Sequence, residues 1–225
     1  RLAVFDCDGT LVDSQHNICT AMVRAFEGAK LVPPDRPSIL SVVGLSLPLA
    51  IARLLPGHEA DFHEHLSEQY KLCFQQMRRE NSVTEPLYDG IADLVRDLDA
   101  QGWLLGVATG KSDRGLDFCL RHHGIHAHFV TLQTADRHPS KPHPSMLHQA
   151  MADAGAVPET TVMIGDTSYD IEMAVNAGVR GVGVSWGYHL PGELLRAGAS
   201  AVAGDSADRK STRLNSSHRC ISYAV

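Results

Sequence analysis

The stretch that decides the fold is residues 2–10, which read LAVFDCDGT. Its first four residues are apolar without interruption, as is typical of a strand buried on both faces of a sheet. The run ends at Asp6, and a turn signal, Asp8-Gly9-Thr10, follows directly. In open parallel sheets ligands bind beyond the carboxyl ends of the strands, so the residues at that end are the first candidates for a functional site.

Beyond residue 85 the sequence alternates between short apolar runs and helical spacing. Strands are expected at 103–108, 128–131, 161–164 and 182–184, with a possible last one at 201–202. Helices are expected over 91–98, 113–123, 144–154 and 168–176. This order predicts an α/β fold with a Rossmann-like parallel sheet, built from residues 1–14 and 82–207.

Residues 15–81 differ from the rest of the chain, because their apolar positions follow helical spacing and no segment has the pattern of a strand. Prolines at 33, 34, 37, 48 and 56 divide the segment into several helices. We therefore expect residues 15–81 to form a separate helical domain inserted after the first strand.

Composition excludes several classes of protein. The chain has 225 residues, a net charge of −6 and 44% hydrophobic residues, which indicates a globular protein without a nucleic-acid-binding or anionic-membrane surface. It has no apolar run of membrane-spanning length. The five cysteines are scattered without metal-binding spacing, so we expect no zinc site or disulfide framework and a cytoplasmic location.

The two ends of the sequence are interpreted separately. Residues 208–225, DRKSTRLNSSHRCISYAV, resemble the translation of a sequencing-library adapter, and we predict that they are a non-native tail without function. The chain does not begin with Met, and we expect its natural start to be missing.

Residues suited to binding a metal or a phosphate gather at the predicted carboxyl ends of the strands, or in the loop that follows one. They are Asp6, Asp8, Thr109, Gly110, Lys141, Asp166 and Asp170. Several carboxylates in one crevice repel one another and require a cation. Ligands that are all oxygen favour Mg²⁺, while a lysine, a hydroxyl and free amides suit a phosphate group.

These segments resemble the four motifs of the haloacid-dehalogenase-like (HAD) hydrolases. The matching residues are 6–14 (DCDGTLVDS), Thr109, 140–144 (SKPHP) and 165–170 (GDTSYD). Within the superfamily the likeness is greatest to bacterial phosphoglycolate phosphatase-like proteins of subfamily I, which carry a helical C1-type cap where residues 15–81 lie. The resemblance implies a Mg²⁺-dependent phosphatase of small phosphomonoesters, working as a monomer or homodimer.

The resemblance also implies roles for the acidic residues. Asp6 would attack phosphorus and become an aspartyl-phosphate, and Asp8 would protonate the leaving alkoxide and then activate water. The carboxylates of Asp6 and Asp166 and the backbone carbonyl of Asp8 would bind Mg²⁺. The dehalogenases and phosphonatases of the superfamily lack the second Asp, so Asp8 favours phosphoryl transfer.

The remaining matched residues would handle the phosphoryl group. Thr109, the amides near Gly110 and Lys141 would bind its oxygens, and Asp170 would orient Lys141 or a metal-bound water. Lys111 fits a phosphate contact and a solvated surface lysine equally well.

Several interpretations stay open at this point. A phosphosugar mutase or pyrophosphatase on the same core, or a non-catalytic phosphate- or partner-binding module, are the alternatives to a phosphatase. Segment 43–46 fits a substrate-facing loop as well as an interhelix turn, and Asp13-Ser14 is interpreted as a helix cap. A substrate carboxylate could bind Arg53, Arg78 or Arg79, and the sequence does not choose among them.

Overall fold

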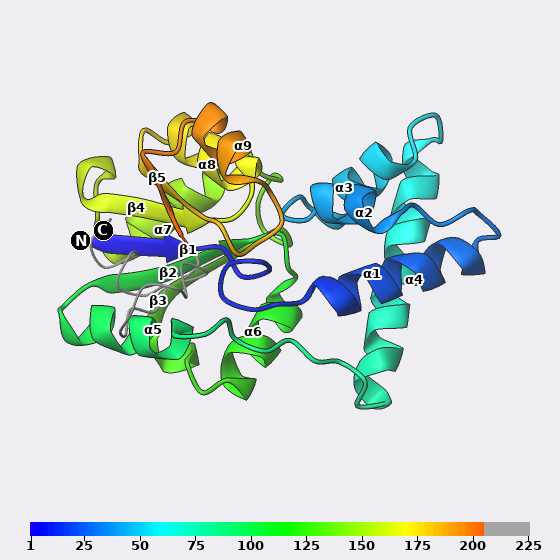
Figure 1. Cartoon of the computed structure of the whole chain (residues 1–225), viewed down its shortest axis with the longest axis horizontal. Helices are drawn as coiled ribbons and strands as arrows, with labels where there is room; N and C mark the ends of the chain where they lie inside the picture. Colours follow the sequence, from blue (N-terminus) through cyan, green and yellow to red (C-terminus); the bar gives the residue numbers. More distant parts are fainter. Residues whose placement is uncertain (205–225) are drawn as a thin grey trace, which may run out of the picture.

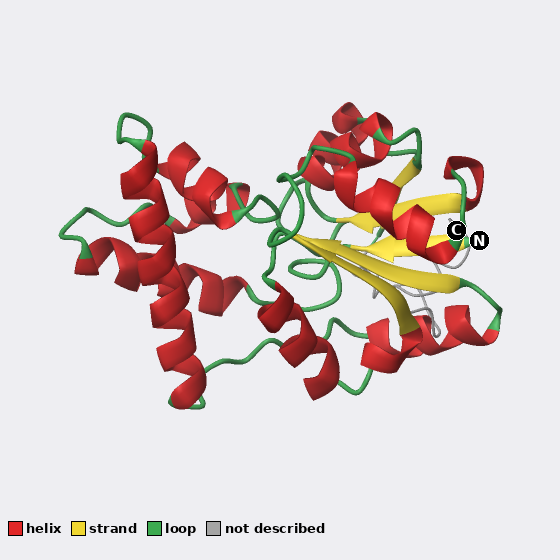
Figure 2. Ribbon diagram, turned by 180° about the vertical axis from the view of Figure 1, so that it is seen from behind, coloured by secondary structure: helices red, strands yellow, loops and turns green. Residues whose placement is uncertain are grey.

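The computed structural model describes residues 1–204, so the predicted tail at 208–225 lies outside the described residues. A parallel sheet with helices on both faces forms one half of the molecule, and a group of helices forms the other half (Figure 1). The view from behind shows the same division (Figure 2).

The sheet has six parallel strands in the order β3-β2-β1-β4-β5-β6. The strands are β1 Leu2–Phe5, β2 Leu104–Thr109, β3 Phe129–Thr134, β4 Thr161–Gly165, β5 Arg180–Val184 and β6 Ala201–Ala203. The predicted Rossmann-like parallel sheet is confirmed. The strand order reverses between β1 and β4, and such a reversal opens a crevice at the carboxyl ends of the two strands.

Successive side chains of β1 point into two different cores, as the period of a strand requires. Ala3 and Phe5 pack in one apolar cluster, and Leu2 and Val4 pack in another. Helices α5 Ile91–Ala100 and α6 Asp113–His122 contribute to the first cluster, and α7 Ser145–Ala154 and α8 Ser168–Asn176 contribute to the second. Burial on both faces explains why the strands read as continuous apolar runs.

Four helices occupy residues 15–81, which we call the helical unit. They are α1 Gln15–Gly28, α2 Arg36–Ser41, α3 Leu47–Leu54 and α4 Ala60–Arg79, and they share an apolar core of their own. Two short helices, α2 and α9 (Pro191–Ala197), were not predicted, because six or seven residues are too few to establish a helical period.

The helical unit contacts the sheet half through polar groups. The Tyr169 hydroxyl accepts a hydrogen bond from Arg53 (2.7 Å) and donates one to the Ser41 carbonyl (2.9 Å). The Ser46 amide donates to the Ser140 hydroxyl (2.8 Å). These contacts hold the unit against the edge of the sheet at which the functional residues were predicted.

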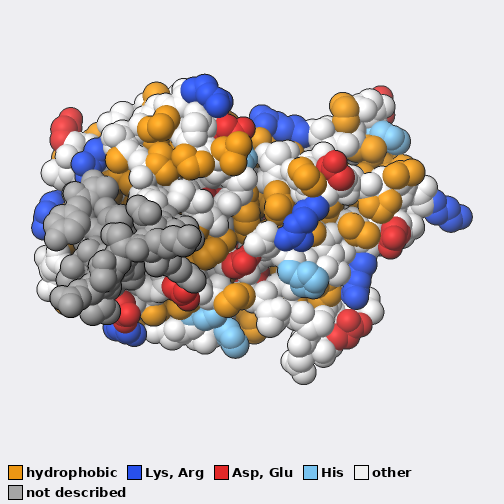
Figure 3. Space-filling model, in the orientation of Figure 1, with side chains coloured by type: hydrophobic (Ala, Val, Ile, Leu, Met, Phe, Trp, Pro, Cys, Tyr) orange, Lys and Arg blue, Asp and Glu red, His pale blue; other side chains and the backbone are white. Residues whose placement is uncertain are grey.

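Acidic, basic and apolar side chains are interspersed on the face of the molecule that Figure 3 shows. Within residues 1–204, none of the helices is both long enough and apolar enough to cross a bilayer.

Candidate active site

The ammonium group of Lys141 lies between two carboxylates that come from different parts of the chain. Its Nζ is 3.0 Å from Oδ1 of Asp6 and 2.6 Å from Oδ1 of Asp170, and all three side chains are buried. Asp6 directly follows β1, and Asp170 lies in the first turn of α8. The structure thus brings Lys141 to the end of the central strand.

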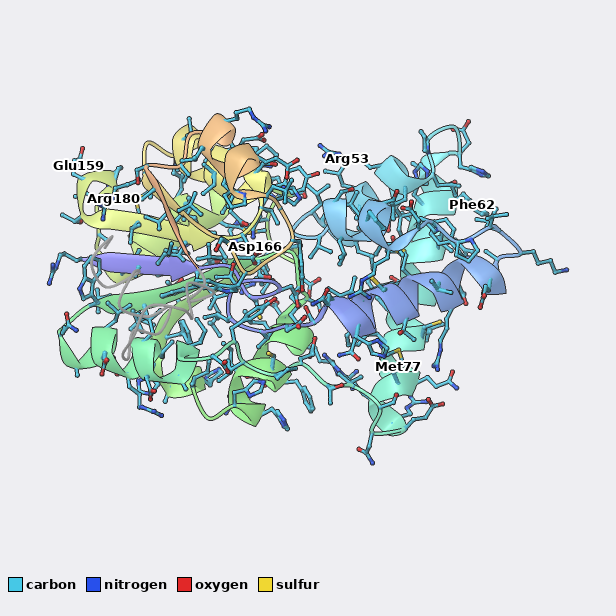
Figure 4. All side chains as sticks on the ribbon, viewed as in Figure 1. Arg53, Phe62, Met77, Glu159, Asp166 and Arg180 are labelled. Carbon is cyan, nitrogen blue, oxygen red and sulfur yellow. The ribbon has the colours of Figure 1, made fainter. Side chains whose placement is uncertain are left out.

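The third carboxylate, Asp166, follows β4 and is held by hydrogen bonds on both oxygens. Oδ1 accepts a hydrogen bond from the Thr10 hydroxyl (2.8 Å), and Oδ2 accepts one from the Tyr188 amide (2.9 Å). The neighbouring backbone must be glycine: a Cβ at Gly9 or at Gly187 would lie 2.2 Å from an Asp166 atom, and Gly9 also has a φ of +87°. In Figure 4, Asp166 lies where the sheet faces the helical unit.

Asp6, Asp166 and Asp170 form a site that fits a hard divalent cation. Each offers one carboxylate oxygen, and these oxygens lie within 4.8 Å of one another. The second oxygen of Asp6, Oδ2, is buried and has no hydrogen-bond partner within the described residues. A donor set made only of carboxylate oxygens suits Mg²⁺.

The pKa shifts of Asp6, Asp166 and Lys141 reflect an excess of negative charge in the aspartate cluster. Burial raises the pKa of Asp6 to about 7, and the charges of Asp170 and Asp8 add to this effect, while Lys141 opposes it. Burial and the charges of Asp170 and Asp6 raise the pKa of Asp166 well above its usual range. Burial alone would lower the pKa of Lys141, but Asp170 and Asp6 outweigh burial, so that pKa is raised. One ammonium group does not balance three buried carboxylates, and an added cation would.

Asp8 lies beside this cluster but has different partners. Its Oδ1 accepts hydrogen bonds from the Ser14 hydroxyl and from Lys111, whose Nζ also lies 2.9 Å from Oε1 of Glu85. Lys111 is therefore paired with two carboxylates and is not a solvated surface lysine. In this arrangement its ammonium group is not free to bind a phosphate. Ser14 directly precedes α1, but its side chain makes no capping hydrogen bond, so the interpretation of Ser14 as a helix cap was wrong. Asp13 instead accepts a hydrogen bond from the Gln15 amide (3.3 Å).

Glu85 is the residue that the sequence analysis missed. It lies in the segment that returns the chain from the helical unit to the sheet half. No motif marks Glu85, and only the return of this segment to the end of β2 brings it to Lys111. Burial alone would lower the pKa of Lys111, but Asp8 and Glu85 outweigh burial and raise it.

Thr109 and Gly110 complete the edge of the site at the end of β2. Thr109 is buried, and both residues line a cavity of about 460 Å³ together with Asp6 and Asp8. Segment 43–46 of the helical unit lines the same cavity, so it is both an interhelix turn and a wall of the site. Four of the predicted site residues therefore line one cavity: Asp6, Asp8, Thr109 and Gly110.

Within residues 1–204, the aspartate cluster of Asp6, Asp166 and Asp170 is the only group of three or more acidic, histidine or cysteine side chains that lie close enough together to hold a metal ion. Ser112 caps α6, since its hydroxyl accepts a hydrogen bond from the Gly115 amide (3.2 Å).

Comparison with known proteins supports the family resemblance. A family model described as haloacid dehalogenase-like hydrolase matches residues 3–184. A probable phosphatase IndB of Dickeya dadantii is 34% identical over 202 residues, which cover 87% of this chain and 86% of that protein. A phosphoglycolate phosphatase of Pseudomonas putida is 31% identical, over 84% of this chain and 71% of that protein.

A solved structure shows the same fold. The crystal structure of a predicted phosphatase from Clostridium acetobutylicum superimposes with a TM-score of 0.84, covering 99% of this chain and 98% of that one. The two sequences are 24% identical, so this likeness bears on the fold alone.

Proposed function

Because this chain belongs to the haloacid dehalogenase-like hydrolases, we propose that it is a Mg²⁺-dependent phosphatase of small phosphomonoesters. The observation that carries the proposal is the state of Asp6 at the end of the central strand. Its Oδ1 is held by the Cys7 amide (2.6 Å) and Lys141, while its buried Oδ2 has no hydrogen-bond partner within the described residues. A fixed carboxylate with one oxygen free is suited to act as a nucleophile.

In the first transfer, Oδ2 of Asp6 attacks phosphorus and the bond from phosphorus to the leaving oxygen breaks. Asp8 donates its proton to that oxygen, so that the product leaves as an alcohol. Thr109 and Lys141 bind the phosphoryl oxygens, and Lys141 is held in place by Asp170. The result is an aspartyl-phosphate at Asp6.

In the second transfer, water attacks the phosphorus of the aspartyl-phosphate. Asp8, now ionised, accepts the proton of that water, and the bond from phosphorus to Oδ2 breaks. Inorganic phosphate leaves, the Asp6 carboxylate is restored, and Asp8 again carries a proton, taken from the water, in place of the one that it gave to the alcohol. Asp8 therefore acts first as an acid and then as a base.

The residues that would hold Mg²⁺ are the carboxylates of Asp6 and Asp166 and the backbone carbonyl of Asp8. When bound, the ion supplies positive charge that reduces the repulsion between the phosphoryl group and the carboxylates. The excess of buried negative charge in the aspartate cluster supports this assignment.

We further propose that residues 15–81 act as a cap on a core formed by residues 1–14 and 82–207. Closure of a cap excludes water during the first transfer and protects the aspartyl-phosphate. A reducing cytoplasm is the proposed location, supported by the free thiols of Cys7, Cys19, Cys73 and Cys119.

The test is hydrolysis of p-nitrophenyl phosphate by the purified protein, with Mg²⁺ and with a chelator. We expect turnover with Mg²⁺ alone, and its loss in Asp6→Asn, which removes the nucleophile at nearly constant volume. Asp93→Asn, which changes an exposed acid on α5, is the matched control. Absence of Mg²⁺-dependent turnover by the folded protein would favour the non-catalytic binding module.

Two further substrates separate the enzymatic alternatives. Conversion of glucose 1-phosphate to glucose 6-phosphate without release of phosphate would identify a mutase. Faster turnover of pyrophosphate than of any phosphomonoester would identify a pyrophosphatase.

A further inference from the structure

The cavity above the site is larger and more apolar than a two-carbon substrate requires. Its volume of about 460 Å³ lies within the range of roughly 300–1,000 Å³ that is typical of pockets for drug-sized ligands. The helical unit supplies an apolar wall opposite Asp6 and Asp8, made of Ile18, Met22, Ile39, Val43, Tyr70 and Phe74. A molecule such as 2-phosphoglycolate would leave most of this wall in contact with water, at a cost in free energy.

One cation in the wall has no ion pair within residues 1–204. Arg78, in the last turn of α4, lines the cavity and is half-buried. Its Nε is buried without a hydrogen-bond partner, and no ion pair within residues 1–204 includes this side chain. A guanidinium that lines a cavity and has no ion pair can bind an anionic ligand through its terminal nitrogens, Nη1 and Nη2.

Two aromatic rings hold the Arg78 guanidinium in place. Its carbon lies 5.2 Å from the centre of the Phe74 ring and 4.8 Å from the centre of the Phe118 ring. Phe74 belongs to the helical unit and Phe118 to α6, so the guanidinium lies at the boundary between the two halves of the molecule. A preorganised guanidinium is well suited to bind a carboxylate through two hydrogen bonds.

The structure also distinguishes Arg78 from the other two candidate arginines. Arg53 donates to the Tyr169 hydroxyl and does not line the cavity. Arg79 is exposed and does not line the cavity either. Of these three side chains, only that of Arg78 faces the space in which a substrate would lie.

We propose that the substrate is a phosphomonoester whose alcohol has an apolar body the size of a ring and a carboxylate remote from the phosphate, which Arg78 binds. This inference rests on the proposed phosphatase activity. The phosphate would lie at Asp6, the apolar body against the wall of the helical unit, and the carboxylate at the guanidinium. Arg78 is thus a specificity-determining residue, and the protein prefers such esters to 2-phosphoglycolate.

The test compares three esters in the wild-type protein: 2-phosphoglycolate, phenyl phosphate and carboxyphenyl phosphate, the last with its carboxylate in the meta or para position. We expect kcat/KM to be at least about tenfold higher for the better carboxyphenyl ester than for phenyl phosphate, as for a charge-assisted hydrogen bond. Phenyl phosphate should in turn be a better substrate than 2-phosphoglycolate.

Two variants assign the effect to Arg78. Arg78→Gln is expected to reduce the ratio of kcat/KM between carboxyphenyl and phenyl phosphate at least about tenfold, mainly through KM. Arg79→Gln removes the same charge from the adjacent exposed position and should leave the ratio unchanged. Because the ratio compares two esters in one variant, a loss of activity that is common to both esters does not alter it.

The outcomes separate failure of this inference from failure of the proposed function. Faster turnover of 2-phosphoglycolate than of both aromatic esters, or an equal loss for all esters in Arg78→Gln, would overturn the inference and leave the phosphatase intact. Failure of the wild-type protein to hydrolyse any of the esters or p-nitrophenyl phosphate would overturn the proposed function itself.

Discussion

Gly110 lies directly against the backbone of Leu45, and this contact joins the edge of the sheet to the helical unit. A Cβ atom at position 110 would lie 2.6 Å from the Leu45 carbonyl oxygen and 2.9 Å from the Gly44 carbonyl oxygen. Both neighbours are backbone atoms, which cannot move aside as the end of a flexible side chain can. The helical unit can therefore lie this close to the active-site edge only if residue 110 has no side chain.

We expect Gly110→Ala to lower kcat/KM by roughly 10- to 100-fold, because a displacement of the helical unit on the order of 1 Å misplaces the groups around the substrate. Steady-state hydrolysis of p-nitrophenyl phosphate measures this effect. Gly28→Ala is the control: no atom lies within 4 Å of the added methyl group, and activity should be unchanged. Equal activity in the two variants would show that the contact at Gly110 has no part in closure.

Metal binding is expected to change stability as well as activity. Adding Mg²⁺ to chelator-treated protein should raise the melting temperature, because the ion binds the folded aspartate cluster and stabilises it by mass action, by about 2.7 kcal/mol at 100 times Kd. Asp166→Asn should reduce the rise, whereas Asp93→Asn should retain it. A rise of equal size in all three proteins would place the ion elsewhere.

The pH dependence of stability provides a third prediction, for the metal-free protein. The pKa of Asp6 is raised from 3.8 to about 7 on folding, mainly by burial, so between these pH values the folded state binds more protons than the unfolded state. The Asp6 contribution to the free energy of unfolding is therefore largest below pH 3.8 and is lost as the pH rises to about 7.

Urea unfolding of wild-type protein and Asp6→Asn, both with chelator, measures this contribution as a difference between the two proteins. The wild-type protein should lose stability relative to the variant as the pH increases across this interval. A difference that is independent of pH would mean that Asp6 titrates alike in the folded and unfolded states.

Lys111→Met provides the fourth prediction. The substitution removes the cation between Asp8 and Glu85 and leaves two largely buried carboxylates without it, so the Asp8 side chain loses its fixed position. We expect kcat for p-nitrophenyl phosphate to fall about tenfold or more, in the range of a lost general acid–base contribution. Lys30→Met, at an exposed lysine outside the cavity lining, should leave kcat unchanged.

Much of the fold could be predicted from local patterns, because buried parallel strands and their flanking helices carry strong signals. The helix predicted at 168–176 has the same bounds in the structure, and the strand predicted at 103–108 differs by one residue at each end. The positions of Asp6 and Asp166 at strand ends could be predicted for the same reason. Their proximity also required that β1 and β4 be neighbours, which hydrogen bonding between strands decides.

The partners of the charged residues could not be predicted. Ser14 has the sequence context of a helix cap, yet its hydroxyl donates to Asp8, because the chain turns sharply after β1. In the sequence, Lys111 fits a phosphate contact and a solvated surface lysine equally well, but in the structure Glu85 reaches it from the segment that returns from the helical unit. The Lys111–Glu85 pair joins residues that lie 26 positions apart in the sequence, and no local pattern records it.

The amino-acid sequence by itself determined the parallel α/β architecture, the inserted helices and the set of acidic residues that follow β1 and β4. These features depend on apolar periodicity and on turn residues, which act over a few positions along the chain. Only the tertiary structure decided which oxygen of Asp6 stays without a partner, which arginine faces the cavity and how closely the helical unit approaches Gly110. These depend on how separate segments pack against one another, because burial and pairing are properties of the folded chain as a whole.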